Sequence, residues 1–125
     1  MTAVMLSCFF RRRRRLTPPQ DKREERNIGA DIMYVKRVLP NGVRIISERL
    51  DNVRTVSVGI WVGNGSRYEP AELNGISHYI EHMIFKGTEK RTARHIAIAI
   101  DALGGQANAF TDKECTCYYM KVLDS

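Results

Sequence analysis

Alternation of apolar and polar residues predicts a series of strands in the first half of the globular region. From Thr55 to Val62 the apolar side chains recur at every second position, the period of a strand with one buried face. Upstream, the apolar runs Tyr34–Leu39 and Val43–Arg49 flank Pro40-Asn41-Gly42. An Asn-Gly pair between two such runs favours a tight hairpin, because both residues tolerate a positive φ. We therefore expect a hairpin followed by a third strand.

The pattern changes to a helical period after Gly63-Asn64-Gly65-Ser66 and the polar loop that follows it. A first helix is predicted over about Gly75 to Phe85. Thr92 is a suitable N-cap for a second helix, which ends at Leu103 because Gly104-Gly105 favours a C-terminal stop. The expected buried stripe of this second helix consists of Ala93, Ile96, Ile100 and Leu103.

Two more strands are predicted over Gln106 to Phe110 and Glu114 to Leu123. The order β-β-β-α-α-β-β is typical of an α+β domain in which helices pack on an antiparallel sheet. A length of 125 residues with 43% hydrophobic residues suits one domain and is too short for two.

Residues 1–32 differ in composition from the rest of the chain. They carry eight Arg/Lys and four Asp/Glu, whereas residues 33–125 carry twelve and ten, so the globular part is nearly balanced in charge. Nothing in the first segment can bury enough apolar area to offset the entropy of ordering. We expect a basic, disordered tail over residues 1–32 and one domain over residues 33–125.

The uninterrupted run Arg11 to Arg15 leaves four interpretations open. It can be a solvated tail, a mitochondrial presequence, a contact for nucleic acid or anionic membrane, or a consequence of a start site assigned upstream of Met33. The nearly balanced charge of the domain argues against a nucleic-acid surface, so no nucleic-acid partner is expected. No stretch approaches the roughly 18 apolar residues of a membrane span.

Cysteine usage points to a reducing compartment. The three cysteines, an odd number without regular spacing, argue against a disulfide framework. Cys115 and Cys117 would face the same side of a strand, so apolar packing is preferred for them over a Cys-x-Cys metal site. We expect a bacterial cytoplasm, with mitochondria as the alternative that the arginine-rich tail suggests.

The strongest candidate for a functional site is the segment His78-Tyr79-Ile80-Glu81-His82, which has two imidazoles and a carboxylate within five residues. On a helix, the two histidines share one face about a turn apart, where two neutral imidazoles can hold one zinc ion. Glu81 projects from the flank of that face and could take a proton from a zinc-bound water. The pattern indicates metal-assisted peptide hydrolysis; the alternative is an amphipathic helix with capped or solvated histidines. His95, on the second helix, is expected to be an ordinary surface residue.

The chain resembles the inverzincin metallopeptidases, the family of pitrilysin, insulysin and the mitochondrial processing peptidase. The resemblance covers about Met33 to Ser125 and is most like bacterial members of the processing-peptidase branch. It rests on four segments in the family's order: Leu39-Pro40-Asn41-Gly42, Gly63-Asn64-Gly65-Ser66-Arg67, His78 to Thr88, and Gly104-Gly105-Gln106-Ala107-Asn108-Ala109-Phe110-Thr111.

The resemblance implies that His78 and His82 bind Zn²⁺ and that Glu81 is the general base on the zinc-bound water. It implies that the edge strand with Asn108, Ala109 and Phe110 pairs with a peptide or protein substrate in extended conformation. Without the resemblance, Asn108 would be interpreted as a turn or strand-end residue.

The family's third zinc ligand, a glutamate on a later helix, has no counterpart before Ser125. Neither Glu89 nor Glu114 matches its position, and the family's second homologous domain is also missing. We therefore expect an incomplete N-terminal half of a catalytic domain that is weakly active alone. A homodimer or a paired subunit is plausible. The rival hypothesis is a non-catalytic scaffold or partner subunit of the same fold.

Overall fold

The computed structural model describes residues 2–7, 22–27 and 33–124 of the chain. The elements, in chain order, are β1 (Thr2–Ser7), β2 (Lys22–Asn27), β3 (Met33–Val38), β4 (Arg44–Arg49), β5 (Thr55–Val62), the short 3₁₀ helices η1 (Ser66–Tyr68) and η2 (Ala71–Leu73), α1 (Ile76–Ile84), α2 (Ala93–Ala102), β6 (Gln106–Thr111) and β7 (Thr116–Leu123).

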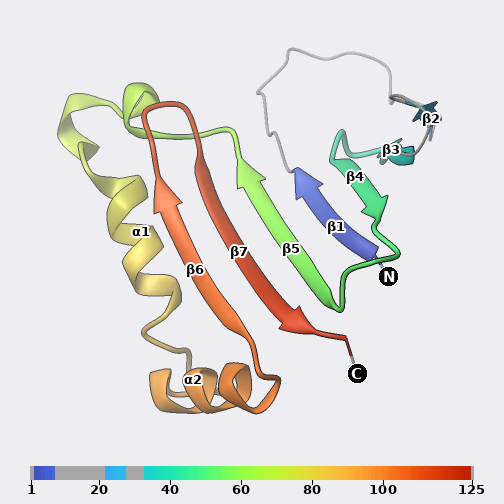
Figure 1. The fold of residues 1–125 in the computed structure, drawn as a ribbon. Coiled ribbons are helices and arrows are strands. Elements are labelled where there is room, and N and C mark those ends of the chain that lie inside the picture. The colour runs from blue at the N-terminus through green and yellow to red at the C-terminus, as the bar shows by residue number, and fades with distance from the viewer. Residues whose placement is uncertain (1, 8–21, 28–32, 125) are drawn as a thin grey trace.

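The strands form one sheet in the order β2-β3-β4-β1-β5-β7-β6 (Figure 1). Every neighbouring pair is antiparallel except β1 and β5, which run parallel. The predicted α+β class with helices beside an antiparallel sheet is confirmed, with this one parallel pair added.

The structure contains two strands, β1 and β2, in residues 1–32, the segment predicted from the sequence to be a disordered tail. The run Thr2–Ser7 is apolar enough to form a strand, and its backbone fills the space between β4 and β5. Lys22–Asn27 is highly charged, which suits its place at the edge of the sheet. The division of the chain at residue 32 stays a prediction, and Arg11 to Arg15 lie outside the described residues.

The predicted hairpin joins β3 to β4. The Leu39 N–H donates to the Val43 carbonyl at 2.8 Å, and the Gly42 N–H donates to the Leu39 carbonyl at 2.8 Å. Gly42 has φ +86°, a conformation that an L-residue with a Cβ adopts only at a cost. The predicted hairpin is therefore confirmed, but its turn differs from the expected one: Gly42 has a positive φ and Asn41 does not, because the turn closes from Leu39 to Gly42 with Pro40 and Asn41 at its centre.

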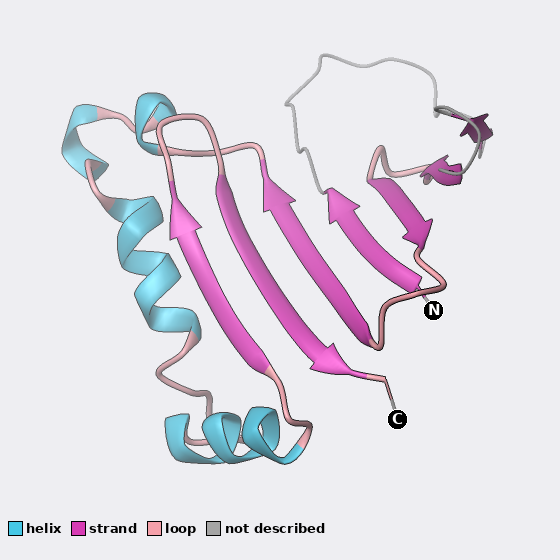
Figure 2. Ribbon diagram, viewed as in Figure 1, coloured by secondary structure: helices cyan, strands magenta, loops and turns pink. Residues whose placement is uncertain are grey.

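Both helices contact β6, so they lie beside the edge of the sheet that β6 forms (Figure 2). The Thr92 hydroxyl accepts the His95 N–H at 3.2 Å, which confirms the predicted N-cap of α2. The helix ends where Gly104 takes φ +59° and donates to the Asp101 carbonyl at 2.9 Å. This stop leads directly into β6, the strand beside α1.

Few side chains are fully buried. Among the described residues Cys117, 1% exposed, is the one buried hydrophobic residue, and Ser77 and Thr116 are the buried polar ones. The expected buried stripe of α2 is wrong in part: Ile96 and Ile100 are half-buried, but Ala93 and Leu103 are exposed. Ala93 lines an open cavity instead of a filled core, and Leu103, which does not line that cavity, is 59% exposed.

That cavity has a volume of about 910 Å³ and lies between α2 and one face of β5, β7 and β6. Its apolar lining includes Trp61, Phe85, Ile96, Ile100, Phe110 and Tyr119. Phe110 pairs with Cys117, which pairs with Trp61, so these three share one face of the sheet. Neighbouring Thr111 therefore belongs to the opposite face.

Candidate active site

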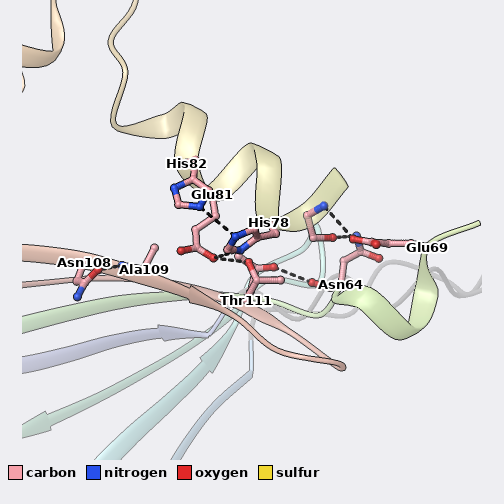
Figure 3. A network of polar contacts seen from close by, with 10 residues as sticks. Asn64, Glu69, His78, Glu81, His82, Asn108, Ala109 and Thr111 are labelled. Atoms are coloured by element: carbon pink, nitrogen blue, oxygen red, sulfur yellow. Dashed lines mark hydrogen bonds and ion pairs between the residues drawn. The ribbon is translucent and has the colours of Figure 1, made fainter. Parts of the chain in front are cut away.

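The two histidines of the candidate site lie one turn apart on α1. Their Nε2 atoms are 3.0 Å apart, and the ring centroids are separated by 4.5 Å in an edge-to-face arrangement. Figure 3 shows both imidazoles and Glu81 projecting from the helix toward β6. The predicted helix therefore brings His78, Glu81 and His82 together on one face.

The geometry of these nitrogens fits a zinc ion. Zinc–nitrogen bonds of about 2.0–2.1 Å in tetrahedral geometry place two nitrogen ligands roughly 3.3 Å apart. The observed 3.0 Å between the Nε2 atoms of His78 and His82 is close to that separation. Within the described part of the chain, no group of three His, Cys, Asp or Glu side chains is placed to hold a metal. The described residues thus bring together two nitrogen atoms that could act as ligands, those of His78 and His82.

Glu81 is held more tightly than either histidine. Its Oε2 accepts a hydrogen bond from the Thr111 hydroxyl at 2.6 Å and lies 3.6 Å from His78 Nδ1. The Glu81 side chain is 13% exposed, whereas the His78 side chain is 65% exposed. Because the ring's Nδ1 faces the carboxylate, its Nε2 is directed to the side where His82 lies.

Burial and the charge of Glu81 both affect the pKa of Tyr118, a residue of the sheet below the helix. Burial raises the pKa of the Tyr118 phenol, and the negative charge of Glu81 raises that pKa further. Tyr118 pairs with Ala109 in the register of β7 and β6, on the same face as Thr111. The carboxylate therefore stands over the end of β6 and within electrostatic reach of β7.

A second glutamate, Glu69, caps the helix that carries the site. Gly75 occupies the N-cap of α1 with φ +91° and has no side chain to offer. Glu69 replaces it: Oε2 accepts the Gly75 N–H at 2.6 Å and Oε1 accepts the Ser77 N–H at 2.9 Å. A hydrogen bond donated by the Ser77 hydroxyl, followed by those donated by the Gly75 and Ser77 N–H groups, lowers the pKa of the Glu69 carboxyl.

Glu69 supports the site although no sequence pattern predicts this role. It lies six residues before the N-cap and reaches the helix only because η1 and η2 fold back. One feature of the sequence pointed to a cap from elsewhere: Gly75, at the predicted helix start, has no side chain that could accept the free N–H groups of the first turn.

The glycine-rich loop before η1 is fastened to the turn between β6 and β7. Ser66 N–H donates to the Asp112 carbonyl at 3.1 Å, Arg67 N–H donates to the Lys113 carbonyl at 2.9 Å, and Arg67 forms an ion pair with Glu114. A Cβ on Gly65 would lie 2.3 Å from the Asp112 carbonyl oxygen, so only glycine allows this approach.

A separate set of contacts joins this loop to the first turn of α1. The Thr116 hydroxyl donates to the Asn64 carbonyl at 3.0 Å, and the Asn64 amide donates to the Ser77 hydroxyl at 3.4 Å. Ser77 directly precedes His78. These two hydrogen bonds fix the start of α1, the helix that carries His78, Glu81 and His82, relative to the start of β7.

The residues predicted to bind substrate lie on β6, away from the histidines along the strand. β6 is the last strand in the sheet order, so one of its edges has no strand partner among the described residues. The Ala109 N–H donates to the Asn108 side-chain oxygen at 2.8 Å (Figure 3). Phe110 is 44% exposed and faces the cavity. No hydrogen bond joins Asn108, Ala109 or Phe110 to the histidines in the described structure.

The structure also places His95 and two of the three cysteines. His95 is exposed on α2, as expected for a surface histidine. Cys117 is buried and Cys115 half-buried, and neither forms a disulfide within the described residues. None of the helices in the described residues is long and apolar enough to cross a bilayer.

Comparison with known proteins places the site in context. Residues 44–125 match the family described as Insulinase (Peptidase family M16). A protein of Bacillus subtilis (strain 168) named as an uncharacterized zinc protease is 61% identical over 92 residues, which are 74% of this chain and 22% of that protein.

Two eukaryotic relatives carry other names. A probable mitochondrial-processing peptidase subunit beta of Arabidopsis thaliana is 51% identical over 87 residues, 70% of this chain and 16% of that protein. The ubiquinol-cytochrome-c reductase complex core protein I of Euglena gracilis is 46% identical over 87 residues, 70% of this chain and 17% of that protein. The chain spans about a fifth of the length of these curated relatives.

Proposed function

Because the chain belongs to the insulinase family, peptidase family M16, we propose that it is the N-terminal part of a zinc-dependent metalloendopeptidase. The observation that carries the proposal is the pair of Nε2 atoms of His78 and His82, 3.0 Å apart on one helix face with Glu81 beside them. The name of the Bacillus subtilis relative, a zinc protease, supports the same metal and reaction.

The proposed chemistry divides the work between the metal and this chain's residues. A zinc ion held by His78 and His82 would polarise the scissile carbonyl and lower the pKa of a water molecule to about 7. Glu81 accepts the proton of the attacking water as its O–H bond breaks, while the oxygen's electron pair adds to the carbonyl carbon. When the C–N bond breaks, Glu81 delivers that proton to the leaving amine.

We further propose that the free edge of β6 aligns the substrate. An extended peptide can add to the edge through main-chain hydrogen bonds, with Asn108, Ala109 and Phe110 as the pairing residues. The Ala109 N–H supports this assignment, because it donates to the side-chain oxygen of Asn108 on the same strand. A substrate carbonyl can replace that side chain as the acceptor.

Completion of the metal site requires a ligand from outside the described residues. We propose that it comes from the remaining length of the protein, since this chain spans about a fifth of its relatives. The isolated chain is accordingly expected to bind zinc weakly and to hydrolyse peptides poorly. Robust, chelator-sensitive turnover by residues 1–125 alone would refute this part of the proposal.

The test begins with the gene product isolated from its own cell. We expect an intact mass several times the 14.3 kDa of this chain, about one zinc per site, and peptide hydrolysis. Glu81→Gln should abolish hydrolysis and retain zinc, whereas the exposed Glu72→Gln should change neither. A hydrolytically active Glu81→Gln protein would remove the proposed base.

A second candidate is a non-catalytic scaffold or partner subunit. The relative named as a core protein of a ubiquinol-cytochrome-c reductase complex favours it, as does the lack of a third ligand in the described residues. The presence of His78, Glu81 and His82 favours the enzyme. Zinc content separates the two, because a scaffold requires no metal. A native product of about 14.3 kDa without zinc would select the scaffold.

Partner and compartment follow as further proposals. A paired subunit or homodimer is supported by the relative named as a peptidase subunit beta. The Bacillus subtilis relative has a higher identity than the Arabidopsis one, 61% against 51%, which supports a bacterial cytoplasmic protein over a mitochondrial one. Analytical ultracentrifugation of the native product tests the association.

A further inference from the structure

Thr111 stands at the end of β6 with its hydroxyl directed at the candidate general base. The Thr111 Oγ1–H donates to Glu81 Oε2 at 2.6 Å, the length of a hydrogen bond strengthened by a charged acceptor. The two residues are 30 positions apart in the chain, so the bond exists only in the folded arrangement. A β-branched side chain on a strand has few χ1 rotamers, which makes this hydroxyl a stiff donor.

The two oxygens of the Glu81 carboxylate have different surroundings. Oε2 accepts from Thr111 and lies 3.6 Å from His78 Nδ1. Oε1 receives no hydrogen bond from any other residue that the structure describes. A carboxylate anchored through one oxygen keeps the lone pairs of the other available for a proton.

We propose that Thr111 is a positioning residue for Glu81: it fixes Oε2, so that Oε1 is the oxygen that takes the proton from the attacking water. This inference rests on the proposed peptidase function. Thr111 touches neither the metal ligands' Nε2 atoms nor the reacting atoms. It acts through Glu81.

The position of Thr111 also links the two halves of the candidate site. Thr111 follows Asn108, Ala109 and Phe110 on β6, the strand whose free edge is proposed to carry the peptide. On its other side Thr111 pairs with Thr116 of β7, and the Asp112 N–H donates to the Cys115 carbonyl at 2.8 Å. The β6–β7 hairpin therefore holds both the proposed base, Glu81, and the strand proposed to pair with the substrate.

The competing explanation is that the bond only fastens α1 to the sheet. Thr116 provides a matched control for that role. It lies opposite Thr111 in the register, its hydroxyl donates to the Asn64 carbonyl at 3.0 Å, and it has no bond to Glu81. Thr111→Val and Thr116→Val each remove one strand hydroxyl, but only the first removes the donor to the base.

The experiment compares Thr111→Val, Thr111→Ser and Thr116→Val in the full-length gene product. A misplaced base costs up to about 100-fold in rate, so we expect Thr111→Val to lower kcat by roughly 10- to 100-fold. KM and zinc content should stay unchanged, because neither the β6 edge nor the histidines are altered. Thr111→Ser should restore kcat to near wild type. Thr116→Val should lower kcat less than Thr111→Val does, because it removes the bond to Asn64 but keeps the donor to Glu81. Unchanged kcat in Thr111→Val, or no rescue by serine, overturns the inference.

A second readout does not depend on hydrolysis. The ¹³C carboxyl resonance of Glu81, assigned by its loss in Glu81→Gln, should shift in Thr111→Val, return in Thr111→Ser and stay in place in Thr116→Val. If the zinc-loaded wild type hydrolyses no peptide, the proposed function fails and this resonance alone decides the inference. A signal that is unmoved in Thr111→Val then overturns it, and a shift with serine rescue supports the anchored carboxylate.

Discussion

The carboxylate of Glu69 accepts the backbone N–H of Ser77 at 2.9 Å and so closes the first turn of the helix that carries both histidines. Its other oxygen accepts the Gly75 N–H at 2.6 Å. One side chain thus satisfies two of the N–H groups that a helix start leaves without intrahelical partners. A negative charge at this end also interacts favourably with the helix dipole. The orientation of the metal motif therefore depends on a residue outside it.

Replacing Glu69 with Gln should loosen the start of α1. The amide keeps one acceptor oxygen but loses the charge and the second acceptor, so amide hydrogen exchange of Gly75 and Ser77 should become faster. Glu72→Gln is the matched control, because Glu72 lies in η2 and makes no contact with α1 among the described hydrogen bonds. Equal exchange rates in both variants would show that Glu69 does not support the helix.

The same cap predicts a dependence of stability on pH. Hydrogen bonds from Ser77 and Gly75 hold the pKa of Glu69 below its ordinary value of 4.5. A lowered folded-state pKa gives stability that is fully present above 4.5 and is lost as pH falls through the folded value. Urea midpoints of wild type and Glu69→Gln should therefore converge on acidification from pH 6, and a constant gap would contradict the assignment.

Gly65→Ala should destabilise the loop that leads to the site. The added Cβ would meet the Asp112 carbonyl oxygen at 2.3 Å and the Cys115 amide nitrogen at 2.7 Å, and neither backbone atom can move away freely. Overpacking of this kind costs about 1–3 kcal/mol, measurable as a lower free energy of unfolding in urea.

Gly42→Ala is the comparison for Gly65→Ala. Gly42 has φ +86° and nothing within 4 Å of a built Cβ, so only the left-handed conformation is penalised. That penalty is about 1–2 kcal/mol. Gly42→Ala should leave the Arg67–Glu114 contact region unchanged in NMR spectra, whereas Gly65→Ala should shift it. Unshifted resonances of Arg67 and Glu114 in Gly65→Ala would argue against the close approach at Gly65.

Local patterns predicted the elements whose causes are local. The strand over Thr55–Val62, the hairpin between β3 and β4 and the Thr92 cap each depend on neighbours within a few residues, and the structure confirms all three. The spacing of His78, Glu81 and His82 likewise follows from one turn of helix. Their proximity could therefore be predicted without knowledge of the sheet.

The supports of the site depend on contacts between distant segments, and no local pattern indicates them. Thr111 reaches Glu81 across 30 positions, and Asn64 meets Thr116 across 52. β1 lies between β4 and β5, a placement that adjacent-strand reasoning does not produce. The expected burial of Leu103 is wrong for a related reason: periodicity shows which face of α2 is apolar, but not whether another element covers it.

The two described cysteines should differ in reactivity. Burial, followed by the charge of Cys115, raises the pKa of the Cys117 thiol, and Cys117 is only 1% exposed. Since the thiolate is the nucleophile, iodoacetamide should alkylate Cys115 faster than Cys117 in the folded chain. Peptide mapping by mass spectrometry separates the two sites from Cys8. Urea should equalise the rates, and equal rates without urea would mean that β7 is not protected as described.

Removal of either histidine of the motif should weaken zinc binding by the chain. Loss of an outer-shell partner of a metal site costs about 10- to 100-fold in affinity, so loss of a direct ligand in His78→Ala or His82→Ala should cost more. Competition with a chromophoric chelator measures the change in Kd on the chain itself. His95→Ala is the matched control, because His95 is exposed on α2 and its side chain is not part of the pair. An equal loss in all three variants would indicate non-specific histidine binding, and no loss in the motif variants would place the zinc elsewhere.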